Sequence, residues 1–218
     1  MNPARRAALI AAGCFPFTIG AFQQALAMGR VPVTQGINTI KGDVRVNDRP
    51  ATVGQNLRTG DSIATGADSE TLYVIGDSAF FLRARSRVTV ESALSGKIAM
   101  RLLSGALASV FGKGEHVLGA PTATVGVRGT AVYLDTTIQD SLYFCLCYGG
   151  ASLSQDARPG DAYDFTTRHH DQPMFLDRDG TRRPAGAINH TDTELIFLES
   201  VFGREPPFMG TPGLQLYR

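Results

Sequence analysis

The sequence has few cysteines and no excess of charge of either sign, and both shortages exclude whole classes of protein. Cys14, Cys145 and Cys147 are the three cysteines in 218 residues, which is too few for the disulfide framework of a small secreted domain. The formal net charge is +1. Phosphate binding draws on clustered lysine and arginine side chains, so we expect no nucleic-acid partner.

Sequence motifs of well-known enzyme classes are also missing. The chain contains no GxSxG nucleophile turn, no HExxH zinc-binding helix and no glycine-rich phosphate loop. Catalysis by one of these mechanisms is therefore not expected, and we predict a protein that is not an enzyme.

The N-terminal apolar run is too short for a membrane-spanning helix, which requires about 20 apolar residues. Arg5 and Arg6 precede this run, which leads into Ala25, Leu26 and Ala27, an AxA-like cleavage site. This pattern predicts a secretory signal over residues 1–27 and a periplasmic or secreted protein. Removal of the signal would take away Arg5 and Arg6 and leave 19 basic and 20 acidic side chains of the 21 and 20 in the full sequence. A membrane anchor, twin-arginine export and acylation at Cys14 are the alternatives.

Short β-strand patterns dominate the region from residue 36 to residue 135. Residues 42–46, 70–75, 80–84 and 87–91 alternate apolar and polar side chains or are apolar over the length of a strand, and turn-forming residues separate them. Residues 104–111 suit a buried strand better than a helix, and residues 113–117 form a polar link. The pattern predicts an all-β fold, either a sandwich or a stacked β layer.

Three ordered motifs in this region carry a family resemblance. They are LRTGDSIATG at residues 57–66, LSGAL at residues 103–107 and PTATVGVRGT at residues 121–130. The region resembles the FecR domain, a periplasmic module named for a ferric citrate sensor, and we assign residues 28–140 to it. The resemblance implies an all-β periplasmic domain without catalytic activity. Members that control sigma factors carry a cytoplasmic segment and a membrane span ahead of this domain. Here only 27 signal-like residues are expected ahead of it, which argues against anti-sigma control.

The last of these motifs contains an arginine between two glycines. Gly126 and Gly129 permit backbone conformations that a side chain would forbid, and they predict a tight corner around Arg128. The guanidinium group could tie carbonyl groups or a carboxylate such as Asp61 across the fold, or it could bind an anionic ligand. We favour the structural brace, because the arginine is surrounded by small residues and β-strand.

The C-terminal extension, residues 141–218, contains the remaining chemically distinctive residues. Cys145 and Cys147 lie on one face of a predicted strand, and a disulfide between them would be strained. His169, His170 and His190 follow within 46 residues of the first thiol. Together these side chains form a ligand set expected for zinc, copper or iron. The alternative is a pair of exposed histidines and a small apolar pair of thiols.

A short helix is expected from about Thr193 to Phe202, with Asp192 and Glu194 as capping acids rather than ligands. The whole extension is similar to one found on a subset of secreted FecR-domain proteins of proteobacteria. The sequence thus predicts a non-enzymatic binding or sensing module whose partner is an envelope protein or a cell-wall component. A metal-dependent or redox enzyme that uses the Cys/His cluster, or a purely structural envelope protein, are the alternatives.

Overall fold

A computed structural model describes residues 33–211 of the chain. The predicted signal at residues 1–27 lies outside the described residues. Fifteen strands form one hydrogen-bonded sheet, and a single short helix accompanies them among the described residues, which confirms the all-β prediction. In the described part of the chain, no helix has the length and apolar character needed to cross a membrane.

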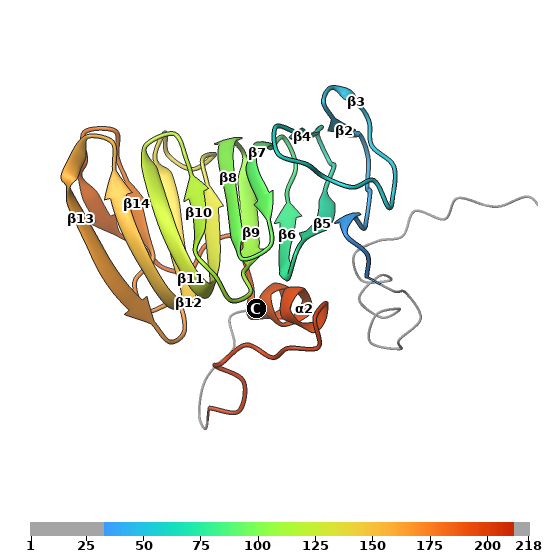
Figure 1. Cartoon of the computed structure of the whole chain (residues 1–218). Coiled ribbons are helices and arrows are strands. Elements are labelled where there is room, and N and C mark those ends of the chain that lie inside the picture. The colour runs from blue at the N-terminus through green and yellow to red at the C-terminus, as the bar shows by residue number, and fades with distance from the viewer. Residues whose placement is uncertain (1–32, 212–218) are drawn as a thin grey trace, which may run out of the picture.

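The sheet curls so that its two halves lie face to face as layers (Figure 1). The first layer contains, in spatial order, β1 (Gly36–Ile37), β5 (Thr71–Ile75), β6 (Ser78–Leu82) and β9 (Ala106–Val110). The second layer contains β3 (Arg49–Pro50), β2 (Val44–Val46), β4 (Ser62–Thr65), β7 (Arg87–Leu94), β8 (Lys97–Ser104) and β10 (His116–Gly119). The predicted polar link at residues 113–117 is therefore wrong at its end, because β10 begins within it.

Two long strands connect the layers. They are β11 (Ala123–Asp135) and β12 (Leu142–Gln155), which pair antiparallel along most of their length. The first half of β11 pairs with β10 and continues the second layer, whereas its second half pairs with β9 and, with the paired part of β12, continues the first layer. The register is irregular between Arg128 and Val132. Beyond β12, the sheet continues through β13 (Arg158–Thr167), β14 (Met174–Leu176) and β15 (Arg182–Pro184). The C-terminal extension therefore adds its strands to the same sheet as the region before it.

The main apolar core fills the space between the two layers. In the second layer, β4 and β8 alternate buried and more exposed positions, as strands with one solvent-exposed face do. Tyr73 of the first layer reaches across this core, and its hydroxyl lies 3.4 Å from the sulfur of Met100 in the second layer. The alternation in these two strands is therefore the consequence of burial on one face.

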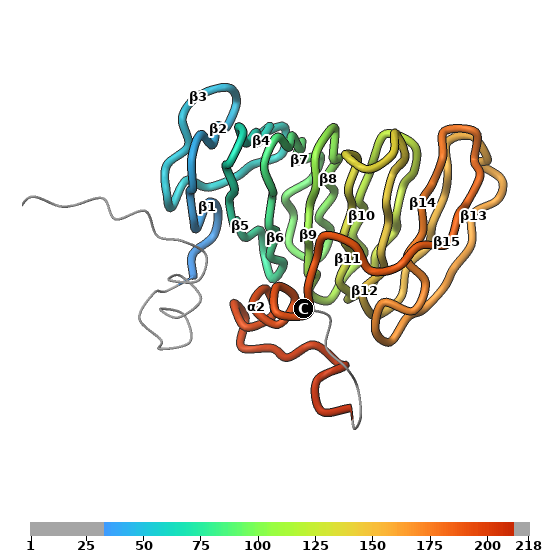
Figure 2. Tube along the Cα trace, turned by 180° about the vertical axis from the view of Figure 1, so that it is seen from behind, coloured from blue at the N-terminus to red at the C-terminus, as the bar shows by residue number. Residues whose placement is uncertain are grey.

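The first layer is buried on both of its faces. Every residue of β5, β6 and β9 is buried, so side chains that point away from the main core also need an apolar cover. Residues 186–211, which we call the C-terminal segment, supply it through the helix α2 (Asp192–Ser200). Figure 2 shows this helix beside β6 and β9, which it contacts. The predicted strand at residues 104–111 is confirmed, and its continuous apolar character reflects this two-sided burial.

The stretch around Arg128 differs from its prediction as a tight corner. Gly129 has the positive φ that was expected, +55°, whereas Gly126 has an ordinary strand conformation with room for a Cβ atom. Both glycines lie within β11, which continues through an irregularity in its register. The corner prediction is therefore wrong, because the chain passes this point as a bulged strand.

The prediction that Arg128 is a buried brace is also wrong. Val125 and Val127 point into the main core, so the period of two turns Arg128 to the exposed outer surface. Asp61 has other partners: its carboxylate accepts hydrogen bonds from the Asn47 side chain and the Arg58 amide, both at 2.7 Å.

Substitutions at two glycines test the close approach of Gly105 to the backbone of Ser86. Gly105 has a φ of +86°, and a Cβ atom there would lie 2.4 Å from the Cα atom of Ser86. We expect Gly105→Ala to reduce the free energy of unfolding by about 3 kcal/mol, because alanine would be strained in the left-handed conformation and its Cβ atom would clash with the backbone. Gly60→Ala, at φ +94° with open space, should cost only about 1 kcal/mol. Urea denaturation measures both, and equal losses would contradict the close approach.

Candidate metal centre

The strand β12 places both thiols on the outer face of the first layer. Tyr143, Cys145 and Cys147 share this face, whereas Leu146 points into the main core. Both thiols are fully buried, and they are not joined in a disulfide. The side-chain alternation predicted for these residues is therefore confirmed.

His170 reaches the thiols from the loop between β13 and β14. Its backbone amide donates a hydrogen bond of 2.8 Å to the carbonyl oxygen of Cys147, and its φ of +50° is a left-handed conformation. The hydrogen bond holds the loop against β12, and the unusual backbone turns this imidazole toward the sulfur atoms. His170, rather than its neighbour His169, therefore faces the thiols.

His190 comes from the C-terminal segment, immediately before α2. The hydroxyl of Tyr143 donates to the carbonyl of Gly186 at 2.8 Å and accepts from the amide of Ile188 at 3.0 Å. The imidazole of His190 stacks on the ring of Tyr133, with 4.4 Å between ring centroids and 12° between planes. These contacts fix the direction in which the ring presents its Nε2 atom to the thiols.

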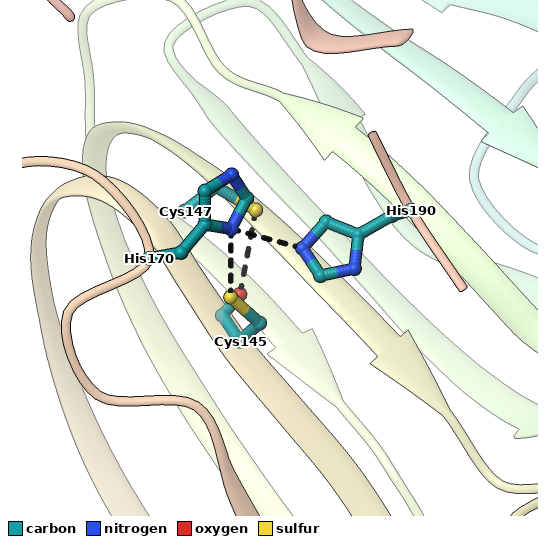
Figure 3. A group of neighbouring side chains, drawn as sticks. All are labelled: Cys145, Cys147, His170 and His190. Carbon is teal, nitrogen blue, oxygen red and sulfur yellow. Dashed lines mark hydrogen bonds between the residues drawn. The ribbon is translucent and has the colours of Figure 1, made fainter. Parts of the chain in front are cut away.

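Four side chains converge on one point, as Figure 3 shows. The Sγ atoms of Cys145 and Cys147, with one ring nitrogen each from His170 and His190, all lie within 4.8 Å of one another. Nδ1 of His170 is 3.2 Å from Sγ of Cys145 and 3.0 Å from Nε2 of His190. A tetrahedral zinc ion with bonds of about 2.0 to 2.3 Å would separate its ligand atoms by roughly 3.3 to 3.8 Å. The group is thus close to the size that one such ion requires.

The outer nitrogens of the two imidazoles determine which inner nitrogens carry lone pairs. Nδ1 of His190 faces the carbonyl oxygen of Ile188 at 2.7 Å, and Nε2 of His170 faces a carboxylate oxygen of Asp192 at 3.1 Å. Because a carbonyl and a carboxylate only accept, each outer nitrogen carries the hydrogen. In neutral rings, two lone pairs then face each other across 3.0 Å. A cation or an additional proton between them removes the repulsion.

Asp192 is a site residue that the sequence reasoning assigned to another role. It lies in the first turn of α2 as expected, but its fully buried carboxylate is 2.9 Å from Nε2 of His169 and 3.1 Å from Nε2 of His170. The capping itself is done by Thr191 and Glu194, which form a capping box. A carboxylate behind a ligating histidine is the usual outer partner in metal sites.

The electrostatic environment favours a positive charge in this cluster. Burial opposes ionisation of Cys145, but hydrogen bonds from the second thiol and the two imidazoles outweigh it and hold the pKa well below its usual value. Burial, together with the neighbouring Cys145, raises the pKa of Cys147. Burial would lower the pKa of His170, yet Cys145 and Asp192 outweigh it and raise this pKa. The first thiol to ionise is therefore paired with an imidazolium ion, or with a metal cation in its place.

The structure brings together four of the five side chains predicted as metal ligands. His169 is the exception, because it belongs to a second group with His170 and Asp192. His116 lies elsewhere, buried at the start of β10, where Nδ1 accepts a hydrogen bond from the amide of Ile98 at 3.1 Å. The helix expected at 193–202 is observed at Asp192–Ser200.

No protein-family model and no curated protein matches the chain. Among solved structures, it is similar to two crystal structures, at 1.65 and 2.50 Å resolution, of a protein from Parabacteroides distasonis ATCC 8503 with a provisional assignment as an anti-sigma factor. Each comparison has a TM-score of 0.48 and 10% identity, and it covers 57% of this chain and 59% of the other. The chain thus matches less than two thirds of that protein's length, and we draw no function from a likeness of this size.

The burial of the thiols predicts how they react. In the native protein, iodoacetamide should leave Cys145 and Cys147 unmodified, because no reagent reaches a fully buried sulfur atom. In guanidinium chloride without reductant, both should be alkylated. Mass spectrometry of the peptide that contains both residues measures this. Protection that persists in the denaturant would reveal a disulfide and contradict the free thiols.

Proposed function

We propose that this protein is a non-enzymatic, FecR-like binding or sensing module built around a Cys2His2 metal centre. The ligands are Cys145, Cys147, His170 and His190, and zinc is the metal that suits them best. Two thiolates with two imidazoles, closed on all sides by protein, form the usual ligand set of a structural zinc site. Copper and iron remain the other metals compatible with sulfur and nitrogen ligands.

The observation that carries this proposal is the convergence of two thiols and two imidazole nitrogens, whose ligand atoms all lie within 4.8 Å of one another. Nδ1 of His170 and Nε2 of His190 lie 3.0 Å apart, and each ring's other nitrogen is committed as a donor. Such an arrangement in a buried apolar face is unfavourable for neutral rings without a cation. When bound, a metal would supply that cation and accept all four donor atoms.

The cellular setting belongs to the same proposal. The resemblance of residues 28–140 to FecR domains and the signal-like residues 1–27 support export to the periplasm or beyond. A module with a filled metal centre and no open coordination position would act through contacts with an envelope protein or a cell-wall component. Four protein ligands leave no place for a substrate on the metal, which supports a role other than catalysis.

A thiol enzyme is the second candidate, and one geometric fact favours it. Cys145, His170 and Asp192 stand in the order of nucleophile, base and orienting carboxylate, with contacts of 3.2 and 3.1 Å. The thiol, however, is fully buried. Four surface pockets of the described residues are lined by other side chains. A second thiol and a second imidazole at the same point suit metal binding better than nucleophilic attack. Rapid alkylation of native Cys145 would favour the enzyme.

Elemental analysis of the mature protein, purified anaerobically with reductant, tests the metal centre. We expect one zinc ion per chain. A matched pair of histidine variants locates it: His190→Gln should lose the metal, whereas His169→Gln, outside the four-ligand group, should retain it. Absence of stoichiometric zinc, copper or iron from the wild type would show that the proposal is wrong. Two ions per chain would instead indicate that His169 and Asp192 hold a second metal.

The carboxylate behind His170 should tune the affinity of the centre. Asp192→Asn keeps the size of the side chain but removes the charge that orients and polarises the imidazole, so we expect zinc to bind about 10 to 100 times more weakly. Asp61→Asn is the matched control, because that carboxylate binds a distant turn. Competition with a chromophoric chelator measures both affinities. Equal affinities for the two variants would exclude an outer-ligand role for Asp192.

A further inference from the structure

We propose that metal binding controls the docking of the C-terminal segment, residues 186–211, on the β layers. This inference rests on the proposed metal centre and adds a conformational consequence to it. With metal bound, the segment covers the outer face of the first layer. Without metal, the segment is released while the layers remain folded.

The origin of the ligands is the first observation. Cys145 and Cys147 belong to β12, and His170 belongs to a loop that is hydrogen-bonded to β12. His190 alone among the four comes from the C-terminal segment. One ion would therefore join a ligand of the segment to three ligands of the sheet, and it would close the chain between residues 170 and 190 into a loop.

The segment covers a face that is otherwise apolar and wide. Leu195, Leu198 and Phe208 of the segment are buried against the outward side chains of the first layer, with Phe81 and Tyr133 among them. The helix has nine residues, which is too short to be stable in water without tertiary contacts. Its folding and its docking are thus one event.

Docking buries polar groups of the segment against this apolar face. His190 and Asp192 are 5% and 0% exposed, and burying an imidazole and a carboxylate is unfavourable unless each is fully paired. Asp192 has its histidine partners. Nε2 of His190 lies 3.0 Å from Nδ1 of His170, and a metal ion between them would compensate for the burial of both rings. A bound metal would therefore make burial of this part of the segment more favourable.

Two further contacts hold the helix, and neither involves a metal ligand. Arg83, just after β6, pairs with Glu194 at 2.5 Å, and its guanidinium lies 5.6 Å from the ring of Tyr133 that stacks on His190. Near the other end of the helix, Glu199 accepts from the hydroxyl of Tyr148 and pairs with Arg204 at 2.5 Å. These contacts allow docking to be weakened without replacing any of the four ligands.

Hydrogen exchange measured by mass spectrometry on the mature full chain tests the release. The zinc-loaded protein is compared with protein stripped by a chelator and kept reduced. We expect peptides within residues 186–211 to lose protection by at least tenfold on metal removal, and peptides from β5 and β11 to keep theirs. Unchanged protection of the segment, or equal loss across the whole chain, would overturn the local release.

Thermodynamic reciprocity provides an independent measurement. If the metal favours docking, weaker docking must lower metal affinity by the same factor. Arg83→Ala, which removes a half-buried ion pair, should weaken zinc binding by about 3- to 10-fold. Arg101→Ala removes a comparable pair with Glu91 at 2.8 Å in the second layer and should leave the affinity unchanged. Equal affinities in the Arg83 variant and the wild type would contradict the coupling.

These outcomes separate the two proposals. If the protein binds one zinc ion but shows the same hydrogen exchange with and without it, the metal centre is supported and the control of docking is wrong. If the protein binds no metal, both proposals are wrong. Rescue of segment protection in the stripped protein by added zinc, but not by magnesium, completes the positive result, because magnesium does not bind thiolate ligands well.

Discussion

The antiparallel pairing of β11 with β12 is the constraint on which the rest of the structure depends. It holds the two layers together as one sheet, and its register sets Cys145 opposite Tyr133 on the outer face of the first layer. Tyr133 in turn supports the ring of His190. A shift of one residue would turn both thiols into the main core, so the candidate site and the closure of the fold share a single determinant.

A layer buried on both faces creates the need for the C-terminal segment. The outward side chains of β5, β6 and β9 are as apolar as the inward ones, and a large exposed apolar face is unfavourable in water. A short helix meets this need, and its Glu194 and Glu199 bind Arg83 and Tyr148 of the sheet region, which fixes its position. The cluster of thiols and imidazoles lies where this cover meets the sheet, which gives the proposed metal its influence over docking.

Local patterns predicted the features that depend on nearest neighbours along the chain. The alternation around Cys145, the strand at 104–111 and the helix after Thr191 follow from side-chain period, apolar content and capping. Predictions about Arg128 and Gly126 failed because they depended on where a bulge lies between paired strands. That position is set by the partners of β11, which are distant in the sequence.

By itself, the sequence determined an all-β chain and a set of five candidate ligands concentrated in one region. The tertiary structure alone decided which of two adjacent histidines faces the thiols, since neighbouring residues can point in opposite directions and only the backbone of the loop after β13 selects one. It also decided that Asp192 is an outer partner of the site rather than a simple capping acid. Both decisions depend on contacts between segments more than 20 residues apart, and such contacts leave no periodic trace in a sequence.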